Sequence, residues 1–225
     1  MPADLARRAA AEAVGTGFLV AVVVGSGIFA QRLSPNDVGL QLLENSIATG
    51  AGLIALILAF MSISGAHFNP VVTLASRLAG HLDNRESVVY VIAQVAGGCV
   101  GVVIANLMFD LPAVTLSTHD RSSAGVWLGE VVATFGLLLV ILALARTDRS
   151  SFVPFAVGGY IAAAYWFTSS TSFANPAVTI ARSLTNTFAG ISPSSVPAFV
   201  IAQLAGGLAA IAFCAYLYRT AVEVS

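Results

Sequence analysis

Residues 172–179 read Ser-Phe-Ala-Asn-Pro-Ala-Val-Thr and lie between two long apolar segments. An earlier stretch, residues 65–73, has a similar pattern and reads Gly-Ala-His-Phe-Asn-Pro-Val-Val-Thr. Asparagine followed by proline is typical of a helix start, because the Asn side chain caps the first turn and proline suits the first helical position. Each stretch therefore predicts an extended run that leads into a short helix. We interpret the rest of the chain as a frame that brings Asn69 and Asn175 together.

The composition indicates a membrane protein. Of the 225 residues, 57% are hydrophobic and only 9% are charged, and the mean hydropathy is +0.88. Soluble domains usually carry roughly a quarter charged residues. We therefore expect an all-α protein embedded in a lipid bilayer, with residues 1–225 forming a single domain. The net charge of -1 argues against nucleic acid as a partner.

Six segments approach the ~20 apolar residues that cross a bilayer as a helix. They cover approximately residues 10–30, 42–63, 87–109, 126–145, 152–167 and 196–218. The apolar runs that follow the two Asn-Pro pairs, residues 71–79 and 178–184, are too short to cross. We predict that these two runs are re-entrant half-helices, which enter the membrane without spanning it.

The sequence repeats itself. Residues 91–98, Val-Ile-Ala-Gln-Val-Ala-Gly-Gly, return at 200–207 as Val-Ile-Ala-Gln-Leu-Ala-Gly-Gly. Glu12 has a counterpart in Glu130 near the start of the second half. Because each half contains three spans, the second half enters the membrane from the opposite side, and the repeats, at about residues 10–109 and 126–218, are inverted. The two half-helices can then meet at the midplane.

The distribution of arginine predicts the orientation, because loops on the cytoplasmic side carry an excess of Lys and Arg. With six spans, both termini share one side. That side would hold Arg7, Arg8, Arg77, Arg85, Arg146, Arg149 and Arg219, and the other side would hold Arg32, Arg121 and Arg182. The sequence therefore places both termini in the cytoplasm.

The expected geometry is that of a passive pore. Non-helical backbone at membrane depth survives where it lines a water-filled cavity, so the extended runs would offer carbonyl groups to a solute. The predicted pore carbonyls are those of Gly65, Ala66, His67, Thr171 and Phe173. The side chains of Asn69 and Asn175 would donate to the same point, and the positive ends of both helix dipoles would repel cations. A small neutral hydroxylated solute could exchange its water contacts for these groups.

The paired Asn-Pro motifs, the two glutamates and the inverted layout resemble the aquaporin/aquaglyceroporin family over essentially the whole chain. The first motif has Val71 where the family usually has alanine. The resemblance implies six transmembrane helices with two re-entrant half-helices, a homotetramer with one pore in each subunit, and a place in the bacterial cytoplasmic membrane.

The family usually has arginine directly after the second Asn-Pro-Ala, at the outer selectivity filter, and here that residue is Val178. Carried over by spacing, the resemblance places the other filter positions at Thr49, Ala163 and Ser172. This set has no aromatic ring, histidine or charge, so it predicts a wide filter. The candidate solutes are glycerol-like polyols, urea and water. A valine in this place also resembles a bacterial subgroup from arsenic-resistance operons, which adds arsenite and methylated arsenicals.

Several residues allow two interpretations. Glu12 and Glu130 could form an ion path, but the resemblance favours acids that hold the irregular Asn-Pro loops through hydrogen bonds. His67 could gate the pore with pH or pack at its inner vestibule. Arg182, one helical turn beyond Val178, could lean toward the pore mouth, although we expect it to face lipid or a loop.

Three functions compete. A facilitator channel for small neutral solutes is the first, and a water-selective aquaporin is the second. The third is an ion-coupled transporter, which can also use inverted repeats and would depend on an ion gradient. The sequence contains no nucleophile–base set, metal-ligand cluster or phosphate-binding loop. We therefore expect neither an enzyme nor a cofactor or metal site.

Overall fold

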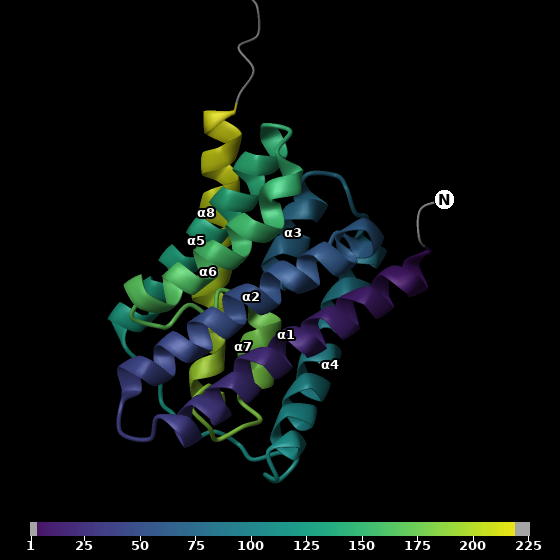
Figure 1. Cartoon of the computed structure of the whole chain (residues 1–225). Coiled ribbons are helices and arrows are strands. Elements are labelled where there is room, and N and C mark those ends of the chain that lie inside the picture. The colour runs from purple at the N-terminus through teal and green to yellow at the C-terminus, as the bar shows by residue number, and fades with distance from the viewer. Residues whose placement is uncertain (1–3, 219–225) are drawn as a thin grey trace, which may run out of the picture.

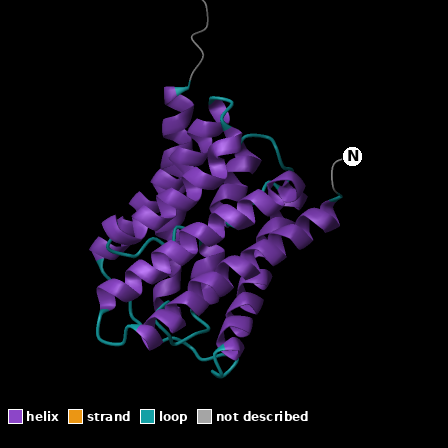
Figure 2. Cartoon of the chain, in the orientation of Figure 1, coloured by secondary structure: helices purple, strands orange, loops and turns teal. Residues whose placement is uncertain are grey.

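The computed structural model describes residues 4–218, and every regular element among these residues is helical. The longer helices are α1 (Leu5–Leu33), α2 (Val38–Ser64), α4 (Asn84–Met108), α5 (Ala124–Arg146), α6 (Val153–Phe167) and α8 (Val196–Leu217). The shorter elements are α3 (Pro70–Leu78), α7 (Pro176–Arg182) and the 3₁₀ turns η1 (Ser150–Phe152) and η2 (Pro193–Ser195). Figure 2 shows the helices joined by loops and turns. The prediction of six long helices and two half-helices is confirmed.

Five segments are long and apolar enough to cross a membrane: α1, α2, α4, α5 and residues 193–217, which contain α8. The remaining long helix, α6, has 15 residues and so spans about 22 Å, less than the ~30 Å of a bilayer core. The Oγ atom of Ser169, just beyond its end, donates to the carbonyl of Gly125 at the start of α5. Hence η1 and α6 together run from the end of α5 back to its start, which is the course expected of the sixth span.

The start of α1 and the end of α8 lie at the same end of the molecule, in the upper half of the view (Figure 1). An ion pair between Arg8 and Glu86 joins the start of α1 to the start of α4 at this end. The arginines expected there lie in the first turns of α1 and α4, the last turns of α3 and α5, and the residue before η1, except Arg219, which lies outside the described residues.

Glycines allow two helix pairs to pack closely. A Cβ atom on Gly97 of α4 would lie 2.0 Å from the carbonyl oxygen of Ala13 on α1. A Cβ atom on Gly206 of α8 would lie 2.3 Å from the carbonyl oxygen of Val131 on α5. Backbones can approach this closely only where the side chain is absent, as at small-residue helix contacts in membranes. The two glycines occupy matching places in the repeated octets at 91–98 and 200–207.

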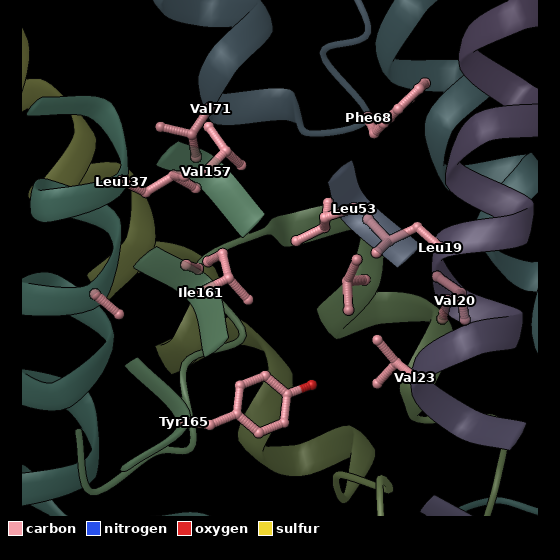
Figure 3. Packing of buried hydrophobic residues seen from close by; sticks show 14 of the residues in the cluster. Leu19, Val20, Val23, Leu53, Phe68, Val71, Leu137, Val157, Ile161 and Tyr165 are labelled. Atoms are coloured by element: carbon pink, nitrogen blue, oxygen red, sulfur yellow. The ribbon is translucent and has the colours of Figure 1, made fainter. Parts of the chain in front are cut away.

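The half-helices α3 and α7 approach the centre of the molecule from opposite ends, with their starts facing each other (Figure 1). Around them, the long helices present buried apolar side chains to the interior (Figure 3). The outward faces are also apolar: Phe18, Phe29, Ile92 and Ile201 are each more than half exposed. An outer surface of this kind suits contact with lipid.

Candidate functional site

The two Asn-Pro loops have the same local structure. After α2, residues Gly65, Ala66 and Phe68 have positive φ angles of 87°, 51° and 50°. Asn69 then caps α3, and its Oδ1 atom accepts a hydrogen bond from the backbone N–H of Val71 at 2.9 Å. The backbone thus leaves helical geometry and re-enters it abruptly at the proline, as the sequence predicts.

The second loop follows the same course. Thr171, Ser172 and Ala174 have positive φ angles of 61°, 50° and 49°. The Oδ1 atom of Asn175 accepts from the backbone N–H of Ala177 at 3.0 Å and from that of the next residue at 3.3 Å. The helix start predicted at Pro176 is therefore observed as well.

Hydrogen bonds between the two asparagines and the opposite loops join the halves of the chain. The Nδ2 atom of Asn69 donates to the carbonyl of Ala174 at 2.8 Å. The Nδ2 atom of Asn175 donates to the carbonyl of Phe68 at 2.7 Å. Each amide group has two N–H donors, and among residues 4–218 only one is used in each case. Both asparagines also line a cavity at the centre of the molecule. The second donor of each is therefore available to a group inside that cavity.

Glu12 holds the first loop in place. This glutamate is fully buried, and its carboxylate accepts hydrogen bonds from the backbone N–H groups of His67 at 2.9 Å and Phe68 at 2.7 Å. It also accepts from the Oγ atom of Ser64 and the Nε2 atom of Gln94. The carboxylate thus satisfies N–H groups that the irregular backbone cannot satisfy itself.

Glu130 does the same for the second loop. It is fully buried and accepts from the backbone N–H groups of Phe173 and Ala174, both at 2.9 Å. The Nε2 atom of Gln203 donates to Glu130 and also to the hydroxyl of Thr179. The two halves therefore use matching residues for the same contact. These hydrogen bonds favour the loop-holding interpretation over an ion path.

A cavity of about 360 Å³ lies between the halves and contacts both loops. Most of its wall is aliphatic. The aliphatic lining residues include Leu19, Val23, Leu53, Ile57, Val72, Leu137, Ile141, Val157 and Ile161. One end, beside the starts of α4 and α6, is lined by His67, His81 and Ser150, and the other end by Thr49, Tyr165, Ser172 and Arg182. The asparagine pair thus provides polar groups in the middle of a largely apolar passage.

The structure places four of the five predicted carbonyl residues on the cavity wall: Gly65, Ala66, His67 and Phe173. Thr171 does not line the cavity, and that prediction is wrong. Its backbone N–H donates to the carbonyl of Thr168 in the turn that follows α6, which leaves Thr171 partly exposed. Phe68 and Ala174, which sequence reasoning missed, line the cavity as well.

Three of the four predicted filter residues, Thr49, Ser172 and Val178, line the cavity, but Ala163 is exposed and does not. The inward face of α6 carries residues four positions apart, namely Val157, Ile161 and Tyr165. Figure 3 shows these three side chains in one column that faces Leu19 and Val23 of α1. Ala163 lies two positions from this face, about 200° around the helix, so its prediction is wrong.

The predicted absence of an aromatic side chain from this end is also wrong. The ring of Tyr165 lies there, and its hydroxyl is 3.1 Å from the Oγ1 atom of Thr49 on α2. Sequence spacing failed here because it does not show which face of α6 turns inward. A tyrosine near the end of an apolar segment was the signal that could have identified this residue, since a phenolic hydroxyl requires a partner when it is buried.

Arg182 was expected to face lipid or a loop, and the structure places it against loop residues but on the cavity wall as well. It is only 3% exposed and lines the same end of the cavity as Val178. Its Nε atom donates to the carbonyl of Ala189, and its guanidinium carbon lies 3.4 Å from the centre of the Phe173 ring. This end of the cavity therefore contains a positive charge, contrary to the prediction.

Comparisons with known proteins agree with this geometry. A profile of the family described as "Major intrinsic protein" matches residues 2–173. The aquaglyceroporin AqpS of Rhizobium meliloti is 54% identical over 218 residues, which cover 97% of this chain and 93% of that protein. The probable aquaporin AqpM of Archaeoglobus fulgidus is 29% identical over 97% of this chain and 98% of that protein. The X-ray structure of the aquaglyceroporin from Plasmodium falciparum has the same fold, with a TM-score of 0.74 over 97% of this chain and 98% of that chain, at 21% identity.

Proposed function

The chain belongs to the major intrinsic protein family, and from this premise we propose that the central cavity is the conducting path of an aquaglyceroporin-type channel. Channels of this family pass water and small solutes across membranes. The chain is accordingly a passive transmembrane channel for small neutral solutes of the glycerol type. Members of this family are transporters, and on that ground we propose that the chain has no catalytic role.

The observation that carries the proposal is the asparagine pair in an apolar passage. Asn69 and Asn175 each keep one donor for the cavity, while aliphatic side chains form most of the wall. A polyol can place its hydroxyl groups on these donors and on the loop carbonyls while its CH₂ groups contact the wall. We propose the carbonyl groups of Gly65, Ala66, His67 and Phe173 as its acceptors.

We propose that Thr49, Ser172 and Val178, with Tyr165 in place of Ala163, form the selectivity filter. Val178 offers neither charge nor hydrogen bond at this point, so the filter accepts a solute with an apolar side. The proposed solutes are glycerol-like polyols, urea and water, and also arsenite and methylated arsenicals. A filter specific for water would instead require an opening too narrow for a polyol.

The hydrogen bonds of Glu12 and Glu130 argue against an ion-coupled transporter. Among residues 4–218, Glu12 and Glu130 are the buried carboxylates. Both are engaged by backbone N–H groups, and neither lines the cavity. We propose that they are structural acids and that solute flux through this chain does not depend on an ion gradient.

We further propose a single domain built from inverted halves at residues 10–109 and 126–218. The matching pairs Glu12 and Glu130, and Gly97 and Gly206, support it. We propose a homotetramer in the bacterial cytoplasmic membrane with both termini in the cytoplasm. Of the described arginines, six lie at the end that holds the start of α1, and Arg32, Arg121 and Arg182 are the others, which supports this orientation.

The test is solute flux in reconstituted liposomes. Stopped-flow light scattering would record the response of vesicles containing the native chain to glycerol, urea and sucrose gradients, with and without ionophores that collapse ion gradients. We expect glycerol and urea flux well above that of protein-free vesicles and unchanged by ionophores. Water flux without glycerol flux would support a water-selective channel, and loss of solute flux with ionophores would support a transporter.

A further inference from the structure

We propose that Arg182 supplies the fixed positive charge by which this pore rejects cations, from one helical turn beyond Val178. The inference rests on the proposed function, because it requires the central cavity to be the conducting path. It assigns a specificity role to a residue outside the filter positions carried over from the family.

The register of α7 places Arg182 on the cavity. Residues four positions apart share one face of a helix, and both Val178 and Arg182 line the cavity. The first turn of α7 therefore presents an apolar side chain to the passage and the last turn presents a guanidinium group. A solute that enters from the Arg182 end meets this charge beside Thr49, Tyr165 and Ser172.

Contacts on one side fix the guanidinium group in this position. Its Nε atom donates to the carbonyl of Ala189, and its carbon lies over the ring of Phe173, at a distance typical of cation–π contacts. That ring packs edge-to-face on Phe199, with 5.1 Å between centroids. The backbone N–H of Phe173 is in turn held by Glu130. A side chain held in this way cannot swing away from the passage easily.

The charge of Arg182 has no counter-ion within salt-bridge distance. In residues 4–218 the ion pair found is that of Arg8 with Glu86, at the other end of the molecule. The terminal guanidinium nitrogens of Arg182 make no hydrogen bond to any described residue. A buried charge without a partner is costly, so these nitrogens require water or solute in the cavity. The charge of the guanidinium group is therefore not neutralised by a neighbour and acts on any solute in the cavity.

Hydroxyl groups also line this end of the cavity. Thr49 of α2 and Tyr165 of α6 both line it, and their hydroxyl oxygens lie 3.1 Å apart. With the free nitrogens of Arg182, these groups can exchange hydrogen bonds with a neutral, oxygen-rich solute. A cation of the same size gains less from the hydroxyls than it loses to the guanidinium.

Arg121 provides a matched control. Its guanidinium carbon lies 5.1 Å from the centre of the same Phe173 ring, and its Nε atom donates to the carbonyl of Gly190. Unlike Arg182, it does not line the cavity. The two arginines thus share their charge and their aromatic neighbour and differ in access to the passage.

The experiment compares urea with guanidinium, which have nearly the same size and shape but differ in charge. Uptake of both radiolabelled probes would be measured in liposomes containing the native chain, Arg182→Gln or Arg121→Gln, with Arg182→Met as a second variant that keeps the aliphatic stem. We expect the native chain to take up urea and exclude guanidinium. Removing the Arg182 charge should raise guanidinium uptake by at least about tenfold, while urea uptake stays similar. The reason is that a fixed unit charge repels a second cation strongly in a low-dielectric passage. Arg121→Gln should behave as the native chain does.

Two results would overturn the inference alone: guanidinium uptake by the native chain at a rate close to that of urea, or continued exclusion of guanidinium by an Arg182 variant that still takes up urea. The first result needs no variant and so does not depend on how the variants fold. If the native chain takes up neither urea nor glycerol, the proposed function itself is overturned and this inference falls with it.

Discussion

At the scale of single residues, Asn69 and Asn175 each do two things with one side chain. The Oδ1 atom caps a half-helix, and the Nδ2 atom binds the opposite loop and keeps a donor for the cavity. Few other side chains combine an acceptor and two donors on one planar group. The same residue type therefore serves both the fold and the passage.

Asn175→Ser separates these two tasks. The serine hydroxyl can still accept at the start of α7 without adding a charge, but the donor to the carbonyl of Phe68 is lost. Asn175→Ala loses the cap as well, worth about 1 kcal/mol. Thermal unfolding in detergent should therefore show a lower Tm for the alanine variant than for the serine variant. We expect glycerol flux to fall in both, and equal Tm values would contradict the cap assignment.

Tyr165 and Ala163 allow a direct test of which face of α6 lines the passage. Tyr165→Ala removes the ring that lies beside Thr49 and should let larger polyols such as sorbitol pass. Ala163→Val enlarges a side chain on the exposed face and should leave the glycerol rate within about twofold of the native rate, since surface changes are usually small in effect. Swelling rates for a series of polyols would measure both. A strong loss of glycerol flux in Ala163→Val would instead favour the register carried over from the family.

The residue scale is also where sequence reasoning failed most. The helix starts at Pro70 and Pro176 could be predicted because their cause is local: a capping side chain followed by proline. The errors at Thr171 and Ala163, and the unexpected place of Arg182 on the cavity wall, have a tertiary cause. The loop between α6 and α7 turns at residues with positive φ angles. The Phe173 ring in that loop stabilises the buried guanidinium group of Arg182.

At the scale of elements, the close helix pairs depend on residues that leave no side chain in the contact. The repeated octets at 91–98 and 200–207 predicted related helices, and the structure shows that each octet packs its first glycine on the neighbouring backbone. The identity of that neighbour could not be read from the sequence, since any small-residue stripe on another span would have satisfied the pattern.

Gly97 and Gly159 form a matched pair for testing this contact. A Cβ atom on Gly97 would lie 2.0 Å from the carbonyl oxygen of Ala13, whereas a Cβ atom on Gly159 of α6 would meet nothing within 4 Å. Gly97→Ala should lower stability by about 1–3 kcal/mol through overpacking. Gly159→Ala should be neutral or slightly stabilising, because alanine favours helix over glycine. Unfolding in detergent would compare them, and equal losses would contradict the α1–α4 contact.

At the scale of the whole molecule, apolar surfaces face both outward and into the central cavity. The outward surface suits lipid, while the inner one lines a passage with polar groups at its centre and at its ends. Composition and the internal repeat were sufficient to predict the membrane setting, the helix count and the meeting of the two half-helices. The balance of charge along the passage was not predictable, because it depends on the burial of Arg182.

Glycerol flux in vesicles containing the native chain or Val178→Arg tests most directly whether the cavity beside Val178 conducts glycerol-type solutes. Val178→Leu serves as a control that adds volume without charge. We expect the native chain to pass glycerol and the arginine variant, at native Tm, to pass it at least about tenfold more slowly, since a second guanidinium would occupy the passage one turn from Arg182. Unchanged glycerol flux through a folded Val178→Arg variant would rule out this path, because Val178 could then not line the limiting part of the pore.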